Sequence, residues 1–263
     1  MSYELTELLQ RCTHEDAEFI IANIDSYINF TDDKGLKEML GQWTTGIMPL
    51  LLAQKIEKEL RYLGSSDVAY AARKLRGLDP AGVPVDEMLD DISKVLKIKL
   101  KRVGTLEGKL EALAKGVVEK TFFNKSPEEQ ISILRKANFE EEKIKIIEDY
   151  INNKGVKIIL PVLMQLLGPK AAMQIFETVL LSVIAMFIGK TAAQQLLKLI
   201  MTKCPWLVAL GPVAVIGLTG WTALDLCGPA MRKTIPILLH LSIVALRDGA
   251  EEESFWTENS NDE

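Results

Sequence analysis

Residues 83–99, VPVDEMLDDISKVLKIK, carry the pattern that indicates the fold class of the chain. Their apolar side chains recur at helical spacing on one stripe, and the carboxylates and ammonium groups between them fall on the opposite face. The stripe consists of Val85, Met88, Leu89, Ile92, Val95 and Leu96. We therefore expect a helix that packs on one side only.

Other stretches carry the residues that begin helices. In CTHED, Thr13 is the expected N-cap, with Asp16 three residues on. In SPEEQISIL, Ser126 and Glu129 make a complete capping box, and Pro127 suits the first helical position. No apolar–polar alternation persists, so strands are not predicted. Breaks are expected at 77–84, at 152–155 and at the Gly-Pro pairs that begin at 168, 211 and 228.

These patterns predict an all-α, multi-helix bundle with a hydrophobic helical hairpin in its C-terminal part. We expect four segments along the chain. They are an N-terminal helical segment at 1–48, an amphipathic helical domain at 49–150, a hydrophobic, basic helical region at 151–248 and a disordered acidic tail at 249–263.

The net charge of −5 conceals a strong segregation of charge. Residues 1–155 hold 23 basic and 27 acidic side chains, residues 156–248 hold 8 and 3, and residues 249–263 hold none and 6. The most apolar region is therefore also the basic one. This combination favours contact with anionic lipid headgroups, and it equally suits docking on the acidic N-terminal half.

The stretch WLVALGPVAVIGLTGWTAL, residues 206–224, contains no charged side chain. Nineteen residues can cross a bilayer as a helix, but Pro212 should break or kink such a helix at 209–212. A second candidate span, at 171–189, contains Glu177, which costs about 2.5 kcal/mol or more deep in a bilayer. A soluble core and membrane association both remain open for these segments.

Seven residues are the candidate membrane or partner contacts of the basic region: Lys190, Lys198, Lys203, Trp206, Trp221, Arg232 and Lys233. In RKTIP, Pro236 predicts a helix start near Ile235. Arg232 and Lys233 would then lie just outside the helix, and their partners would be lipid phosphates or acids of the N-terminal half. Lys94, Lys97 and Lys99 form a separate candidate partner surface. Their stretch lacks aromatic residues in an acidic domain, which argues against nucleic acid binding.

No catalytic, metal or cofactor motif stands out. IGKTAA at 188–193 lacks the first glycine of a P-loop, because position 184 is Ile, and Lys190 is then expected at a helix start. The two histidines are far apart: we expect His14 to be solvated and His240 to hydrogen-bond inside a helical core. Three widely spaced cysteines and the lack of a secretory signal favour a cytoplasmic location. We therefore expect a non-enzymatic protein without a cofactor.

Several short blocks resemble the YaaW-like family of bacterial proteins, which has no known activity. These blocks are LLQRCTHED, ELRYLG, KLRG, LDDISKVLKIK, GPV at 211–213 and RKTIPILLHLSIVALR. The family is distantly similar to the ubiquinol-cytochrome c chaperones, which are all-helical assembly factors and not enzymes. The leading expectation is a protein that associates with the cytoplasmic face of the inner membrane, peripherally or partly inserted, through residues 156–248. The alternative is a soluble chaperone or assembly factor that holds a protein partner in a groove on residues 49–150.

Overall fold

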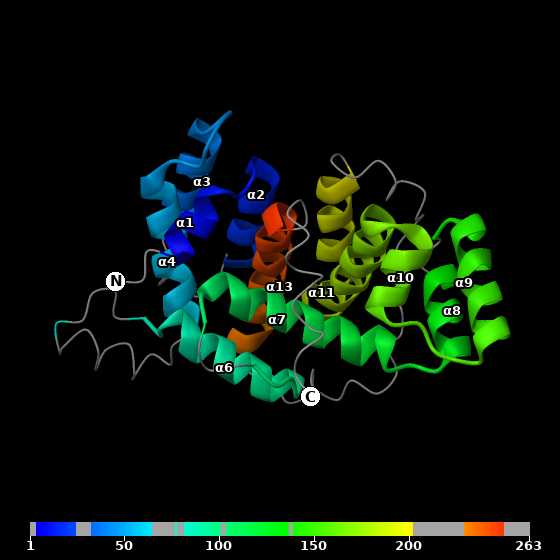
Figure 1. The fold of residues 1–263 in the computed structure, drawn as a ribbon. Helices are drawn as coiled ribbons and strands as arrows, with labels where there is room; N and C mark the ends of the chain where they lie inside the picture. Colours follow the sequence, from blue (N-terminus) through cyan, green and yellow to red (C-terminus); the bar gives the residue numbers. More distant parts are fainter. Residues whose placement is uncertain are drawn as a thin grey trace. The chain divides into compact units, whose positions relative to one another are not determined.

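The computed structural model describes residues 4–24, 33–64, 77, 82–100, 104–136, 139–201 and 229–249. Helices make up the regular secondary structure of these ranges, where no strand occurs, so the predicted all-α class is confirmed (Figure 1). The charge-free stretch at 206–224, its predicted kink and the acidic tail beyond Gly249 lie outside the described residues. The hairpin that this stretch should form stays a prediction.

The chain divides into two compact units. The first comprises Met1–Leu113 with Thr222–Ala245, and the second comprises Ala114–Trp221 with Leu246–Glu263. Two of the boundaries fall inside α7 (Leu106–Val118) and near the end of α13 (Pro229–Gly249). The four-segment division stays a prediction.

The first unit is built from short helices. They are α1 (Glu4–Gln10), α2 (His14–Ile24), α3 (Asp33–Gln42), α4 (Leu50–Leu63), α6 (Val85–Leu96), the first part of α7 (Leu106–Val118) and most of α13 (Pro229–Gly249). Contacts join α1 to α4, and α2 to both α3 and α4. Leu8, Ile20, Leu36 and Ile56 are fully buried, one from each of these four helices. Each such side chain contributes about 1.5–3 kcal/mol to folding.

The helix starts predicted at Thr13 and Ser126 are confirmed. Thr13 donates its N–H to Asp16 Oδ2 at 2.8 Å, and the Asp16 N–H bonds to Thr13 Oγ1 at 3.3 Å, just before α2. Ser126 and Glu129 exchange the same two bonds, at 2.9 and 3.3 Å, before α8 (Pro127–Lys136). Local sequence therefore fixes where these two helices begin.

Helix α6 lies within the amphipathic stretch at 83–99. Its buried apolar residues are Met88, Leu89, Ile92 and Leu96, whereas Asp90 and Lys94 are exposed, as predicted. The chain reaches α6 through Gly82 and Val83, and Val83 exchanges hydrogen bonds with Arg61 of α4 at 2.9 and 3.2 Å. A Cβ atom on Gly82 would lie 2.5 Å from the Arg61 carbonyl carbon. Only glycine fits this approach.

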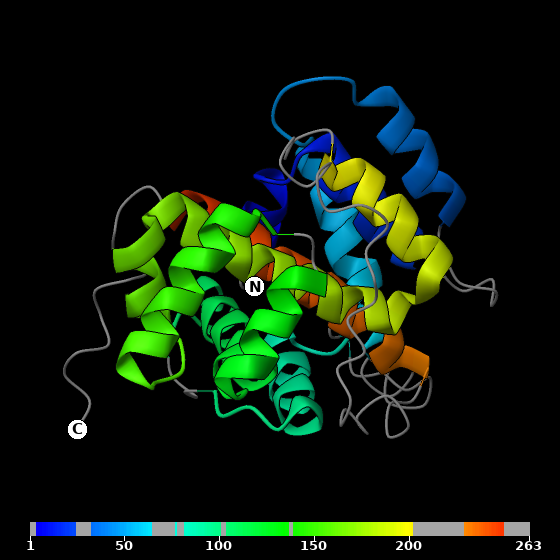
Figure 2. The same cartoon turned by 90° about the vertical axis from the view of Figure 1, so that its right-hand side faces the viewer.

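The second unit continues from α7 through a π-helix, η1 (Glu119–Phe123), to α8, α9 (Glu141–Lys154), α10 (Leu160–Leu167) and α11 (Pro169–Met201). Contacts join α8 to α9, α9 to α10, and α10 to α11 (Figure 2). The predicted breaks are confirmed at Gly155, which ends α9 with a φ of 66°, and at Gly168, which precedes α11.

One buried side chain holds the connection between α9 and α10. Gln130 of α8 donates to the carbonyl oxygens of Phe122 and Ile158 at 3.2 and 2.9 Å, and its oxygen accepts the Ile158 N–H at 2.8 Å. Both Gln130 and Ile158 are fully buried. These bonds fix the extended chain at 155–159 against η1 and α8.

Helix α11 runs for 33 residues without interruption. The prediction that a helix starts near Lys190 is wrong, because the candidate span at 171–189 and the residues that follow it to Met201 form this one helix. Between Ala171 and Phe187 most of its apolar side chains are buried. Of the helices in the described ranges, none is both long and apolar enough to span a bilayer.

The prediction that a helix starts near Ile235 is also wrong. Helix α13 begins at Pro229, directly after the predicted break at Gly228, and it contains Pro236 in its interior. An interior proline removes one backbone donor and costs about 3 kcal/mol. Residues 234–246 are all buried, and this burial offsets the cost. Arg232 and Lys233 therefore lie inside the helix, in its second turn.

We expect Gln130→Leu to lower the free energy of unfolding by roughly 3 kcal/mol, because it leaves three buried backbone groups without partners. Urea denaturation followed by circular dichroism measures this loss. The matched control is Gln165→Leu on the exposed face of α10, which should change stability by less than about 0.5 kcal/mol. Equal effects at the two positions would show that the Gln130 bonds do not hold the connection.

Candidate functional site

The predicted membrane-contact residues fall on different parts of the chain. Lys190 and Lys198 lie in the second half of α11, and Arg232 and Lys233 lie in α13. The remaining three, Lys203, Trp206 and Trp221, lie outside the described residues. Their assembly into one contact surface therefore stays a prediction.

Lys233 acts within the first unit. Its Nζ atom donates to the carbonyl oxygen of Ile24 at 3.4 Å, and Ile24 is the last residue of α2. A cation at the carboxyl end of a helix compensates the helix dipole. This bond joins α13 to the end of α2, and contact of Lys233 with lipid phosphates or acids of the N-terminal half stays a prediction. Arg232 is exposed.

The described residues of the basic region do contain one exposed surface that is both apolar and basic. It comprises Lys154, Val156, Lys157 and Ile159, which we call the 154–159 surface. Val156 and Ile159 are 46% and 44% exposed, and both lysines are exposed. The Gln130 bonds to Ile158 hold this segment in place. The exposure is therefore a fixed property of the folded unit.

No acid accompanies the 154–159 surface in the sequence. Between Asp149 and Glu177 the chain contains three lysines and no aspartate or glutamate. The third lysine, Lys170, is exposed at the start of α11. Lys157 Nζ lies 3.4 Å from Asn124 Oδ1, a neutral partner. The positive charge of this surface is thus not neutralised by neighbours in sequence.

Glu177 stands at the end of this acid-free stretch, partly buried in α11. Burial raises the pKa of its carboxyl above the ordinary value, and the positive charge of Arg247 limits the rise. The folded chain therefore favours the protonated carboxyl more than the unfolded chain does. The free energy of unfolding should fall as the pH rises through the window between the unfolded and the folded pKa, because the buried group then ionises.

The candidate partner surface of Lys94, Lys97 and Lys99 lies at the end of α6, and all three side chains are exposed. Lys94 Nζ forms an ion pair with Asp91 at 2.9 Å. Lys97 has a φ of 54°, and the Ile98 N–H bonds to the Ser93 carbonyl at 2.8 Å, which ends the helix. Lys97 thus occupies the position that usually holds glycine.

A groove of about 440 Å³ lies between α8 and α9. Its lining residues are Pro127, Glu128, Ile131, Ser132, Arg135, Glu148, Ile151 and Asn152. Arg135 bridges Glu148 at 2.7 Å and Glu141 at 3.4 Å. Hydrogen bonds from the backbone and from Ser126 lower the pKa of Glu128, so its carboxylate stays ionised at the rim. The groove combines an apolar floor with a charged rim, and its size suits a small ligand or a few side chains of a peptide.

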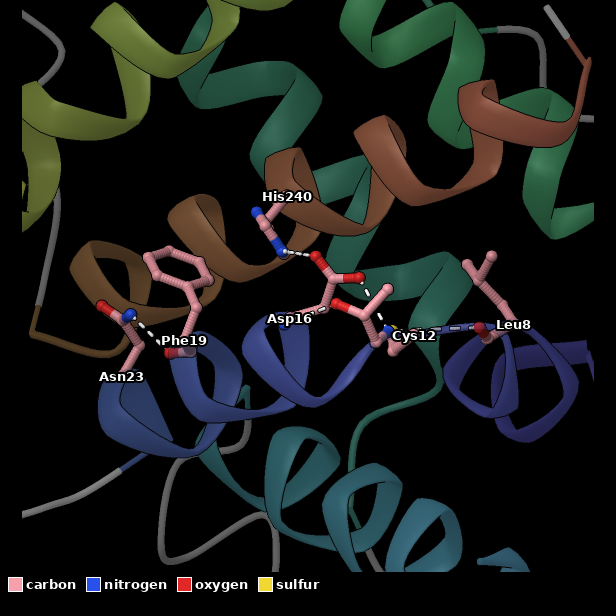
Figure 3. Close-up of polar contacts among 7 residues, drawn as sticks. Leu8, Cys12, Asp16, Phe19, Asn23 and His240 are labelled. Carbon is pink, nitrogen blue, oxygen red and sulfur yellow. Dashed lines mark hydrogen bonds and ion pairs between the residues drawn. The ribbon is translucent and has the colours of Figure 1, made fainter. Parts of the chain in front are cut away.

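The first unit contains a buried pair of titratable side chains. His240 Nε2 of α13 lies 2.9 Å from Asp16 Oδ1 of α2, and the Phe19 ring packs 4.5 Å from the His240 ring, centroid to centroid (Figure 3). Both members of the pair are almost fully buried. His240 Nδ1 is buried without a hydrogen-bond partner.

This pair has neither the geometry nor the accessibility of the Asp–His pair in a catalytic triad, because Asp16 meets Nε2, the atom that serves as the base there. A catalytic histidine must reach a substrate, and His240 is only 1% exposed. Cys12 is also buried, and its Sγ faces the Leu8 carbonyl at 4.0 Å. Among the described residues no group of His, Cys, Asp and Glu could hold a metal ion. The pair therefore serves to hold α13 on α2.

The prediction that His240 bonds inside a helical core is confirmed, but its partner was missed. Asp16 was identified only as a capping residue, since sequence does not show that its second oxygen faces α13. A histidine in the apolar run IPILLHLSIVAL signals that a buried partner exists. His14 is not fully solvated, because its Nδ1 lies 3.7 Å from Glu18 and its ring packs near Trp43.

Comparison of the chain with protein-family models, with curated proteins and with solved structures returned no match. The resemblance to the YaaW-like family and to the ubiquinol-cytochrome c chaperones stays a prediction. A functional inference must therefore come from the surfaces and the groove themselves.

We expect His240→Phe to lower the free energy of unfolding by about 3 kcal/mol, because it leaves the Asp16 carboxylate buried without its main partner. Urea denaturation measures the loss. The same substitution at His14, which is partly exposed, should cost less than about 0.5 kcal/mol. A neutral His240→Phe variant would mean that the pair does not hold α13 in place.

Proposed function

We propose that this protein is a non-enzymatic, helical protein that associates with the cytoplasmic face of the inner membrane through its apolar, basic region, residues 156–248. The observation that carries the proposal is the 154–159 surface, which exposes aliphatic side chains beside lysines in a stretch without acids. Aliphatic groups enter the acyl boundary while ammonium groups contact lipid phosphates.

The expected affinity of this surface is modest. Val156 and Ile159 each contribute about 0.5 kcal/mol on entering the bilayer. Lys154, Lys157 and Lys170 each contribute about 1 kcal/mol beside an anionic surface. The sum of about 4 kcal/mol corresponds to a dissociation constant near 1 mM. The association is therefore reversible, sensitive to salt and dependent on further contacts for strength.

Vesicle sedimentation of the purified full chain tests the proposal. We expect binding to vesicles that contain phosphatidylglycerol, and loss of binding on neutral phosphatidylcholine vesicles or at high salt. Replacing Lys154, Lys157 and Lys170 by Gln should weaken binding about 100-fold, since about 3 kcal/mol is removed.

The matched control replaces Lys94, Lys97 and Lys99 by Gln, which removes the same net charge from α6. This variant should keep most of the affinity. A larger loss in the control than in the test variant would move the contact to the end of α6. No binding of the unaltered chain to anionic vesicles at moderate salt would refute membrane association.

The α8–α9 groove favours a second candidate function, a chaperone or assembly factor that holds a protein partner. It lies largely in the region that the sequence suggested for partner binding, and its lining of apolar and charged side chains of both signs suits a peptide segment with apolar and charged side chains. This function does not require a membrane, so the two candidates separate experimentally.

A photo-crosslinking amino acid at Ser132, inside the groove, tests partner binding in cells. We expect a discrete crosslinked protein from this position. The control position is Lys145, which is exposed on α9 and does not line the groove. Identical crosslinking patterns at both positions, or none at Ser132, would count against the groove as a partner site.

A further inference from the structure

The connection between α3 and α4, together with the first two residues of α4, carries the most exposed aliphatic side chains of the described residues. Ile47, Leu50 and Leu51 are 78%, 52% and 67% exposed, and we call them the 47–51 tip. They lie within sixteen residues, Met39 to Gln54, that contain no charged side chain. Apolar side chains gathered in this way mark interaction surfaces.

The fold holds the tip in this exposed position. Met48, between the exposed residues, is buried, and its carbonyl oxygen accepts a hydrogen bond from Gln10 at 3.4 Å. Trp43 is buried as well, and its indole donates to the Thr45 carbonyl at 3.2 Å. These anchors on both sides of Gly46 prevent the aliphatic groups from turning inward.

The charged side chains of α4 differ in where they point: a lysine faces solvent and the acids face inward. Lys55 and Lys58 follow Leu51 by one and two helical turns, and Lys58 is exposed. The two acids of the helix are turned inward, because Glu57 bonds Thr6 and Arg61, and Glu59 is buried. The N-cap residue of the helix, Pro49, makes no side-chain capping bond, and the positive end of the helix lies at the tip.

Helix α3, which precedes the tip, contains Asp33, Lys34, Lys37 and Glu38 and has no net charge. The excess of positive charge beside the tip therefore comes from α4. An anionic surface is complementary to the exposed lysine of that helix.

We propose that the 47–51 tip inserts into the headgroup–acyl boundary of an anionic bilayer, as a membrane contact of the first unit in addition to the 154–159 surface. This inference rests on the proposed membrane association. Leu51 and Lys58 are seven residues apart, which places them about 10 Å apart along the helix. That spacing lets the lysine meet phosphates while the apolar groups enter about 5–10 Å.

A bilayer suits the tip better than a protein partner does. Protein hot spots are enriched in Trp, Tyr and Arg, and leucine is under-represented among them. The tip offers only aliphatic side chains, with no aromatic ring and no side-chain hydrogen-bond donor. Such a surface has affinity for hydrocarbon but little means of recognising a particular protein.

An environment-sensitive fluorophore on Leu51→Cys tests the insertion in the full chain. Cys204→Ala and Cys227→Ala remove the competing thiols, and Cys12 is buried. On vesicles that contain phosphatidylglycerol we expect a blue shift at position 51. The matched control is the same label at Asp90→Cys, an exposed position of α6 in the same unit, which should show none.

Substitution of the tip gives a second measurement. The combined Ile47→Ser, Leu50→Ser and Leu51→Ser variant should bind these vesicles about tenfold more weakly. The tenfold difference in affinity should persist at salt concentrations that screen the lysines, as long as binding is still measurable. Gln54→Ser, an exposed change one turn away, should leave affinity unchanged.

The outcomes separate the two proposals. No shift at position 51, while the unaltered chain still sediments with vesicles, overturns the tip insertion and leaves the proposed function standing. No vesicle binding by the unaltered chain overturns both. In a third outcome, the unaltered chain is a dimer in analytical ultracentrifugation, and the tip variant is a monomer with unchanged vesicle affinity. This outcome would assign the tip to contact with a second copy of the chain and overturn the insertion.

Discussion

The carboxylate of Asp16 joins two helices of the first unit that lie far apart in the sequence, α2 and α13. One oxygen caps α2 through the Thr13 N–H, and the other meets His240 of α13, 224 residues later in the chain. At the far end of α2, Ile24 accepts a bond from Lys233. Asp16 and Ile24 are eight residues apart on α2, and His240 and Lys233 are seven apart on α13. The two helices therefore run antiparallel, fixed by one polar contact at each end.

This arrangement explains why α13 tolerates Pro236. The proline lies between Lys233 and His240, so a break there would separate the two polar contacts with α2. Burial on all sides from Thr234 to Leu246 stabilises one continuous helix instead. The unpaired Nδ1 of His240 is a remaining cost of the arrangement.

The two proposed membrane contacts follow the same chemical rule in separate units. In each, aliphatic groups are held outward by buried neighbours: Ile158 beside the 154–159 surface, and Met48 beside the 47–51 tip. Lysines accompany both sets of aliphatic groups, while acids are absent from the stretch around 154–159 and turned inward on α4. The charge segregation that the sequence displays over long segments is thus repeated at the level of single surfaces.

The sequence by itself determined the helical class, the capping boxes of α2 and α8, the stripe of α6 and the breaks at Gly155 and Gly168. These features depend on hydrogen bonds and spacings within a few residues, which a local stretch contains. Tertiary structure alone decided that α11 and α13 run through their expected boundaries, that Asp16 is the partner of His240, and that residues 47–51 and 154–159 face outward. Each of those outcomes depends on which distant side chains cover a residue, and burial over many residues outweighs a local signal such as Pro236.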